Sequence, residues 1–373
     1  MKWWGAAPLT SGRESRRGKV MTDTNLRYGR LDHITVLHDN PLKAARFVRE
    51  TMPGRDVDSE LCFRISRLGG GDNECERITA GGVVYQFMKP CKALAGSEEF
   101  FEKNGPQVYS YCIAVDDVDA AVAAMEKGGA KVVAHPTGDD RLPYNAIYEG
   151  EGDPIDYGMV DVIDPCGLRF EFIKKNPQLP CPTGVRYPED QGVFQHAEIV
   201  VPNAVAAADF MCDVMGAERT EKIIYGTITD HNAGTVHVLY GGIVFQLIEP
   251  HPNLLGWKEH MDRIGPSTRI ICYHFKDDLQ PRLDLMTERG AEPIRHPVVE
   301  GVDNGGAATE DENCLPLADT GTFGWMYGDD GDAYERPWKF MWVDSIAQCG
   351  MNWEMIEQSY RWVSSTGYFF SRN

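Results

Sequence analysis

Three residue types that can bind a metal ion recur at matched places in the two halves of this 373-residue chain. The matched pairs are His33 and His196, Gln86 and Gln246, and Glu171 and Glu354. Imidazole, amide and carboxylate groups are common ligands of divalent metals. We therefore expect a metal ion to bind somewhere in the chain. The alternative is that the repeated residues are a relic of duplication and that only one half is active.

The matched residues lie in five sequence blocks that occur in the same order in both halves. LDHITVLHDN around His33 matches FQHAEIVVPN around His196, and GGVVYQFMKP (81–90) matches GGIVFQLIEP (241–250). A late block, Cys-Gly-x-x-x-Glu, ends at Glu171 in one half and at Glu354 in the other. Such ordered self-similarity indicates a duplicated module. Additional residues rich in Gly, Asp and Glu separate the last two blocks of the second half, and this predicts a long inserted loop.

Each half has the rhythm of two βαβββ units, which predicts an α+β fold with four such units in all. A helix should follow Asn40, whose side chain is a suitable N-cap. In the first half we expect strands at 31–38, 59–68, 74–80, 83–90, 108–115, 131–136, 156–164 and 168–174, and helices at 41–52 and 117–130. The expected organisation is an extension at 1–27, a first module at 28–180, a linker at 181–192, a second module at 193–362 with a loop at 298–338, and a tail at 363–373.

The bulk composition restricts the partners. A formal net charge of −19 argues against nucleic acid or an anionic membrane surface. Ten scattered cysteines without a Cys-x-x-Cys pair favour reduced thiols in a cytoplasmic protein. No apolar run approaches the ~20 residues that a membrane span needs. We expect a small-molecule substrate, particularly since no basic cluster for a larger anionic ligand stands out in the sequence.

The paired βαβββ pattern resembles the vicinal oxygen chelate superfamily, which includes glyoxalases, bleomycin resistance proteins and extradiol dioxygenases, over roughly residues 28–360. The resemblance implies two half-open barrels in tandem, each able to hold one divalent ion such as Mn, Co, Ni, Zn or Fe. It further implies ligands on the first, fourth, fifth and eighth strands of a module, and a homodimer, since members commonly pair.

Carried onto this sequence, the resemblance implies one metal site in each module. The implied ligands are His196, Gln246 and Glu354 in the second module, with His33, Gln86 and Glu171 as a second possible set in the first. The second module is the expected catalytic one, because it has the long loop and additional histidines.

The fifth-strand ligand departs from the family pattern. The expected position is Ser110 in the first module and Ile271 in the second, and neither side chain is a strong ligand. His274 lies on the same strand but three residues later, so strict alternation directs it to the opposite face unless a β-bulge intervenes. We include His274 as a conditional fourth ligand.

The retained ligand set resembles that of redox-neutral epimerases more than that of oxygenases. This implies a metal-dependent epimerase or isomerase that abstracts a proton beside a metal-bound carbonyl of a small oxygenated substrate, with a cyclitol ketone such as 2-epi-5-epi-valiolone as one candidate. Glu354 would be ligand and base, and His237 would be an acid–base group. Two alternatives remain: an Fe(II)-dependent dioxygenase of the extradiol or 4-hydroxyphenylpyruvate type, and a non-catalytic small-molecule binding protein.

Overall fold

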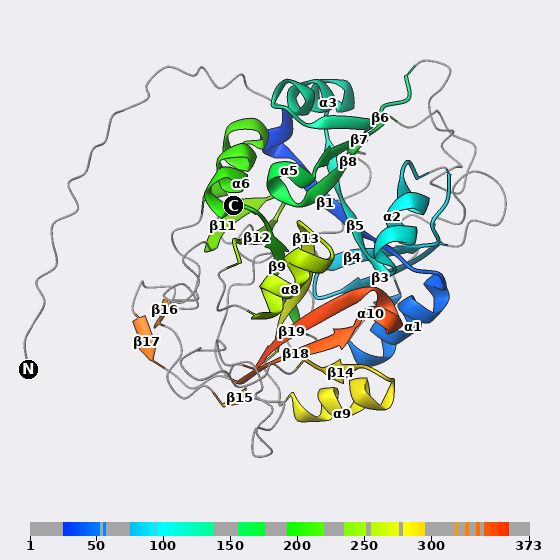
Figure 1. Cartoon of the computed structure of the whole chain (residues 1–373), viewed down its shortest axis with the longest axis vertical. Coiled ribbons are helices and arrows are strands. Elements are labelled where there is room, and N and C mark those ends of the chain that lie inside the picture. The colour runs from blue at the N-terminus through cyan, green and yellow to red at the C-terminus, as the bar shows by residue number, and fades with distance from the viewer. Residues whose placement is uncertain are drawn as a thin grey trace, which may run out of the picture.

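The computed structural model contains two large open β-sheets, each formed by one half of the chain (Figure 1). We call residues 30–174 the first module and residues 193–357 the second module. The structure describes residues 25–52, 55–56, 75–92, 94–137, 156–175, 192–219, 235–250, 255–275, 279–294, 318–319, 325–327, 333–335 and 339–357.

The first module forms an eight-stranded sheet in the order β2-β3-β4-β1-β5-β8-β7-β6. A 3₁₀ turn, η1 (Asn25–Tyr28), precedes it. Its elements are β1 (Arg30–Leu37), α1 (Pro41–Thr51), β2 (Arg55–Asp56), β3 (Cys75–Ala80), β4 (Val83–Met88), α2 (Ser97–Asn104), β5 (Gln107–Val115), α3 (Val118–Lys127), β6 (Lys131–Ala134), β7 (Tyr157–Val162), α5 (Ile163–Cys166) and β8 (Leu168–Lys174). The central strand β1 pairs parallel with β4 and antiparallel with β5.

The second module repeats this order as β10-β11-β12-β9-β13-β19-β18-β14. Its elements are β9 (Val193–Val200), α6 (Ala204–Phe210), the π-helical turn η4 (Met211–Met215), β10 (Glu218–Arg219), β11 (Thr235–Tyr240), β12 (Ile243–Ile248), α8 (Leu255–Arg263), β13 (Ser267–Phe275), α9 (Gln280–Glu288), β14 (Glu292–Pro293), β15 (Ala318–Asp319), β16 (Trp325–Tyr327), β17 (Ala333–Glu335), β18 (Lys339–Ser345), α10 (Ile346–Cys349) and β19 (Met351–Glu357). The predicted α+β fold with two half-open sheets in tandem is thereby confirmed.

Local signals explain why the helices begin where they do. Oδ1 of Asn40 accepts a hydrogen bond of 2.9 Å from the backbone N–H of Lys43, so Asn40 is the N-cap of α1 as predicted. Asn203 caps α6 in the same way through the N–H of Ala206, at 2.8 Å. Side-chain acceptors of this kind satisfy backbone donors that the first helical turn leaves unpaired. The matched caps therefore give each module the same strand-to-helix turn.

The modules are joined by a reciprocal pair of backbone contacts. The N–H of Leu31 on β1 donates to the carbonyl of Gly241 at 2.7 Å, and the N–H of Phe194 on β9 donates to Gly81 at 3.0 Å. Gly81 and Gly241 have φ of +57° and +64°, which a residue with a Cβ rarely adopts. A Cβ on Gly81 would also lie 2.3 Å from the ring of Tyr273. Each glycine turn thus binds the first strand of the other module.

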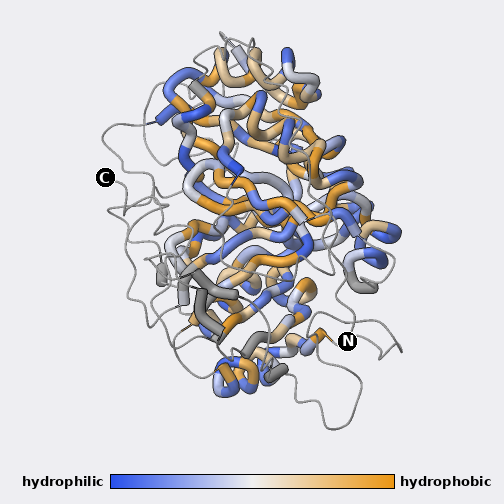
Figure 2. Tube along the Cα trace, turned by 90° about the vertical axis from the view of Figure 1, so that its left-hand side faces the viewer, coloured by the Kyte–Doolittle hydropathy of each residue, from blue (hydrophilic) through white to orange (hydrophobic). Residues whose placement is uncertain are grey.

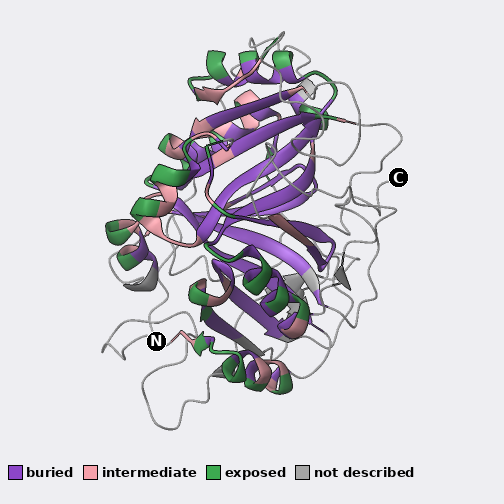
Figure 3. Cartoon of the chain, turned by 90° about the vertical axis from the view of Figure 1, so that its right-hand side faces the viewer, coloured by how far each residue is buried: buried purple, intermediate pink, exposed green. Residues whose placement is uncertain are grey.

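One face of each sheet contributes to a shared apolar core. Figure 3 shows the strands almost wholly buried while the helices keep exposed outer faces, and Figure 2 shows hydrophobic stretches along the central strands. Tyr85 and Tyr273 join the modules in this core through a hydroxyl–hydroxyl contact of 2.7 Å. Because strand side chains alternate, the other face of each sheet is left to line a site.

Several expectations fall on residues outside the described part. These are the extension before residue 25, the strand at 59–68, the linker up to residue 191, most of the loop at 298–338, and the tail at 363–373. The module boundaries at 28–180 and 193–362 therefore stay a proposal. Within the described residues, no helix is long and apolar enough to cross a membrane.

Candidate metal centre

The second module brings its predicted histidine and glutamate together with a cysteine. β13 lies between β9 and β19, and its Cys272 is in register with both His196 and Glu354. Nε2 of His196 lies 3.5 Å from Oε2 of Glu354. Ligand atoms of the three residues lie within 4.8 Å of one another, and all three side chains are buried. Donor atoms this close can share one metal ion.

The structure changes the fifth-strand position from Ile271 to Cys272. Ile271 belongs to the shared core, whereas Cys272 packs on the site side of the sheet with Ile270. Cys272 lies five residues before Asp277, whereas the matched Cys112 lies four residues before Asp116, so a count back from the aspartate reaches a core position in the second module. One signal could have identified it: Cys112 and Cys272 occupy matched positions in the two halves.

Gln246 lies one strand away on β12. It is in register with Glu198 on β9 and with His237 on β11, while Val244 is opposite His196. Its side chain is buried, with 2% exposed. The predicted Gln246 is therefore at the edge of the donor group, one pleat from His196.

Glu198 is a site residue that the sequence reasoning missed. It follows His196 by two residues, so alternation puts both on one face of β9, and its Oε1 lies 4.0 Å from His196 Nε2. Burial first, and then the charge of Glu354, raises the pKa of Glu198 to about 8. Trp257 Nε1 donates to its Oε2 at 3.2 Å, and Arg269 Nη1 lies 3.8 Å from the same oxygen. Two buried carboxylates thus face each other with one guanidinium nearby.

His237 lies beside this donor group. Its ring centre is 6.5 Å from that of His196. Two imidazoles bound to one tetrahedral metal through nitrogens about 2.1 Å away would have ring centres roughly 5 Å apart, so His237 is placed next to the ligands instead of among them. Its Nε2 is buried and makes no hydrogen bond. Burial, followed by the charge of His196, lowers the pKa of His237 to about 3.

His274 is located by its backbone alone. It pairs with Ile356 on β19 and with Val193 on β9. The expectation that it faces away assumed Ile271 as the ligand position, three residues before His274. Cys272 lies two residues before His274. The side chain of His274 lies outside the described part of the structure, so its role as a conditional ligand stays a prediction.

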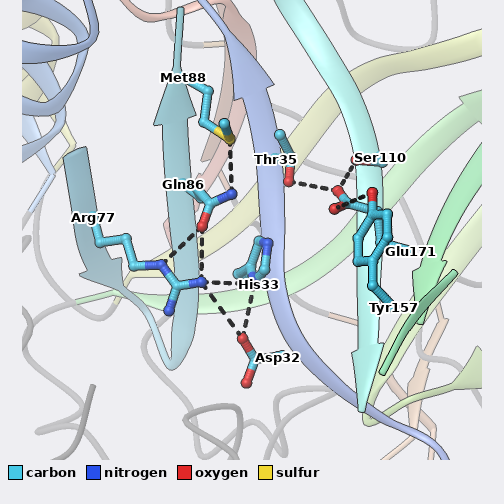
Figure 4. A network of polar contacts seen from close by, with 9 residues as sticks. All are labelled: Asp32, His33, Thr35, Arg77, Gln86, Met88, Ser110, Tyr157 and Glu171. Atoms are coloured by element: carbon cyan, nitrogen blue, oxygen red, sulfur yellow. Dashed lines mark hydrogen bonds and ion pairs between the residues drawn. The ribbon is translucent and has the colours of Figure 1, made fainter. Parts of the chain in front are cut away.

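The first module fills the corresponding place with a cation of its own (Figure 4). Arg77 on β3 is in register with Gln86, as His237 is with Gln246. The guanidinium donates to Oε1 of Gln86 at 2.9 and 2.8 Å, and its Nη2 lies 3.1 Å from Nδ1 of His33.

Asp32 completes this arrangement in the first module. Its Oδ2 lies 2.7 Å from His33 Nδ1 and 3.7 Å from Nη2 of Arg77. Burial alone would raise the pKa of Asp32, but the hydrogen bond and charge of His33, together with the charge of Arg77, hold the pKa below its usual value. Asp32, His33 and Cys112 are close enough to share a metal, yet the guanidinium already supplies the positive charge beside them.

Glu171, the third predicted ligand of the first module, is saturated by hydroxyl groups (Figure 4). Thr35 donates to its Oε1 at 2.8 Å, Ser110 donates to the same oxygen, and Tyr157 donates to Oε2 at 3.1 Å. Burial and the charge of Glu171 raise the pKa of Tyr157 well above its ordinary value, so the phenol stays a donor. A carboxylate with three such donors has little capacity left for a metal. Glu171 is therefore satisfied within the first module, whereas Nε2 of His33 is buried and makes no hydrogen bond.

The donor chemistry of the second module fits a divalent metal. Glu198 replaces the hydroxyl of Thr35, and Ile270 occupies the position that matches Ser110, so Glu354 lacks those two donors. Two buried acids, a thiol and an imidazole form a donor set that a divalent cation would hold deprotonated. A thiolate ligand favours Zn²⁺ or another borderline-soft ion. The predicted divalent-metal cofactor is thus supported by the donors of the second module.

Known proteins are similar to this chain in both sequence and fold. Residues 195–309 match the family described as Glyoxalase/Bleomycin resistance protein/Dioxygenase superfamily. A triple mutant of 4-hydroxymandelate synthase from Streptomyces coelicolor is similar with a TM-score of 0.52 and 14% identity, covering 91% of this chain and 95% of that one. A Mn(II)-bound glyoxalase from Novosphingobium aromaticivorans gives a TM-score of 0.44 and 13% identity, covering 89% of this chain and 84% of that one. No curated protein sequence matches the chain significantly.

The matching segment carries β9, β12 and β13, and hence His196, Gln246 and Cys272. The resemblance predicted from the sequence is confirmed for residues 195–309, which match the model of this superfamily. The likeness to the 4-hydroxymandelate synthase structure covers both modules, and at 14% identity it concerns the fold alone.

Proposed function

We propose that the second module is a divalent-metal-dependent isomerase or epimerase acting on a small carbonyl compound. The observation that carries this proposal is the donor set His196, Gln246, Cys272 and Glu354, in which a thiol occupies the place of a second histidine. Oxygenases with non-haem Fe(II) use two histidines and one carboxylate. The set found here favours chemistry in which the metal stays redox-neutral.

The proposed reaction moves one proton. The ion would draw electron density from a substrate carbonyl and so acidify the neighbouring C–H bond. A basic side chain takes that proton while the C–H electron pair moves toward the carbonyl. The proton then returns to the same carbon from either face, or, in an α-hydroxy carbonyl compound, to the former carbonyl carbon while the hydroxyl proton moves to the other oxygen. No oxidant is consumed, and the electrons balance within the substrate.

Two side chains are candidates for the base. His237 has a buried Nε2 without a hydrogen-bond partner next to the donor group, but its pKa of about 3 makes this imidazole the weaker proton acceptor. Glu354 is in the donor group itself and could combine the roles of ligand and base. The adjacent Trp257 and Trp342 rings, whose centres are 4.9 Å apart, place apolar surface on this side of the sheet.

The test uses the metal-loaded full chain in D₂O with dihydroxyacetone and 2-hydroxycyclohexanone as carbonyl probes. We expect metal-dependent deuterium incorporation next to the carbonyl, observed by proton NMR, and its loss in His237→Gln and Glu354→Gln. If His237→Gln retains exchange, His237 is not the base and Glu354 is the remaining candidate. A chain that binds no stoichiometric divalent metal would overturn the proposal and favour a non-catalytic binding protein.

A dioxygenase remains the second candidate, because the 4-hydroxymandelate synthase fold covers both modules. Oxygen uptake with Fe(II) and a catechol or a 2-oxo acid, without deuterium exchange, would replace the isomerase proposal with this one. A cyclitol ketone as the substrate and a homodimer as the assembly stay predictions from the family resemblance.

A further inference from the structure

A cavity of about 270 Å³ lies where the two modules meet. Its walls come from the turn between α2 and β5 in the first module, and from α8, the start of β13 and the start of β19 in the second. Asn352 lines it and precedes Glu354 by two residues on β19, about 7 Å along the strand. The cavity therefore adjoins the candidate metal centre without including its donors.

The lining of this cavity is strongly cationic. Lys103, Arg263 and Arg269 line it together with His260, and none of the described lining residues carries a carboxylate. The chain as a whole has a net charge of −19, so three cations around one cavity run against the overall balance. Such a concave cationic surface concentrates anions.

Arg269 shows that the charge is held in place. Its side chain is buried, with 6% of the residue exposed, and its guanidinium carbon lies 4.3 Å from the ring centre of Trp257 and 5.8 Å from that of Trp342. Its Nη1 makes no hydrogen bond, since the Glu198 carboxylate oxygen at 3.8 Å is too distant for one. A buried guanidinium N–H without an acceptor is costly, and an anionic oxygen would satisfy it.

Two amide groups leave further polar atoms unsatisfied in the same cavity. Oε1 of Gln107 and Oδ1 of Asn352 are buried and make no hydrogen bond. Acceptors beside a cationic donor match a ligand that has both anionic oxygens and hydroxyl groups, such as a phosphate monoanion or a hydroxy acid.

In the first module, larger side chains fill the place that corresponds to this cavity. Arg169 occupies the position of Asn352, Phe100 that of His260, and Tyr109 that of Arg269. The guanidinium of Arg169 lies 4.9 Å from the ring centre of Phe100 and 4.8 Å from that of Tyr109.

Asp161 holds the Arg169 side chain in this position, because its Oδ2 accepts a hydrogen bond from Nε of Arg169 at 3.1 Å. In the second module a short asparagine replaces the long arginine. The space is therefore a feature of the second module and not a general consequence of the fold.

We propose that this cavity binds the phosphate or carboxylate group of a small molecule. The anion accepts hydrogen bonds from Arg269 at the buried end, and Lys103 and Arg263 neutralise it at the exposed end. This site is independent of the reaction proposed above, because its residues neither donate to the metal nor accept the proton.

The test measures anion binding to the metal-loaded full chain by titration calorimetry at constant ionic strength. Inorganic phosphate and malonate are the probes, so that the two arms separate a phosphate site from a carboxylate site. We expect saturable binding of one equivalent of at least one probe. The double variant Lys103→Gln/Arg263→Gln should weaken it by at least about tenfold. Both residues are exposed, so the fold should tolerate these changes.

Lys258→Gln is the matched control. Lys258 is on α8 with Arg263 but pairs with Asp262 at the surface and does not line the cavity. This variant should bind phosphate within about twofold of the original chain. Phosphate binding that survives the double variant would put the anion on the metal or elsewhere on the surface and overturn the proposal. Absence of saturable binding of either probe would overturn it as well.

Discussion

The first and second modules have the same fold, but the residue beside the matched glutamine is charged in the first and neutral in the second. In the first, Arg77 supplies a fixed cation that contacts His33 and Gln86. In the second, the position in register with the glutamine is His237, whose pKa is lowered to about 3 by burial and by the charge of His196, so it is neutral. The guanidinium of Arg77 thus contacts the histidine and the glutamine of the first module, whereas Arg269 of the second module lies beside Glu198 instead.

The two glutamates extend this contrast. Glu171 receives three hydroxyl hydrogen bonds, but the residue that matches the donor Thr35 in the second module is the carboxylate Glu198. Exchange of a donor for a second acid turns a self-sufficient network into an anionic group that a cation would stabilise. Duplication therefore kept the scaffold, while a few side chains around it separated a structural copy from a candidate catalytic copy.

The largest expected effect is on metal content. Glu354→Gln should lower the affinity for a divalent metal by at least about 100-fold, because a ligand contributes more than the outer-shell groups whose loss costs 10- to 100-fold. The matched change Glu171→Gln should leave the amount of metal per chain unchanged, since Glu171 is satisfied by hydroxyls. Elemental analysis after dialysis measures both. A loss of metal in Glu171→Gln would show that the first module also binds an ion.

The next effect is on stability. Arg77→Met should lower the free energy of unfolding by about 3 kcal/mol, because it leaves the buried Asp32 and Gln86 without their cationic partner. His237→Leu should change the free energy by less than about 1 kcal/mol in chelated protein, since the imidazole Nε2 makes no hydrogen bond that could be lost. Urea unfolding of both variants provides the comparison. Equal losses would mean that the two positions are equivalent.

The smallest effect concerns pH. Burial, and then the charges of Arg269 and Arg263, lowers the pKa of His260 to about 3. Below about pH 6.5, His260 therefore binds a proton in the unfolded chain but stays neutral in the folded chain until the pH approaches 3. The contribution to stability is complete above pH 6.5 and is lost as pH falls toward 3, by at most about 1.4 kcal/mol per pH unit.

The matched residue in the first module, Phe100, cannot titrate, so His260→Phe should reduce the slope of stability against pH between 6.5 and 5. Urea unfolding at several pH values in this range measures the slope. An unchanged slope would show that His260 is not the group responsible.

The sequence by itself determined the repeated scaffold and much of the second site. Period-two strands, the N-cap at Asn40 and the matched blocks predicted the βαβββ order, because these signals act within a few residues. His196 and Glu354 were also identified from their repeated positions, and the structure brings them within 3.5 Å.

Only the tertiary structure decided which side chains complete each site. The position of Cys272 between His196 and Glu354 is set by the pairing of β13 with β9 and β19, which is long-range. The cavity likewise unites Lys103 with Arg263 and Arg269, residues that the sequence separates too widely to suggest a basic cluster. Packing of the whole chain sets the strand register and brings distant turns together. These long-range contacts determine which charged side chains share a site, and local sequence patterns do not contain that information.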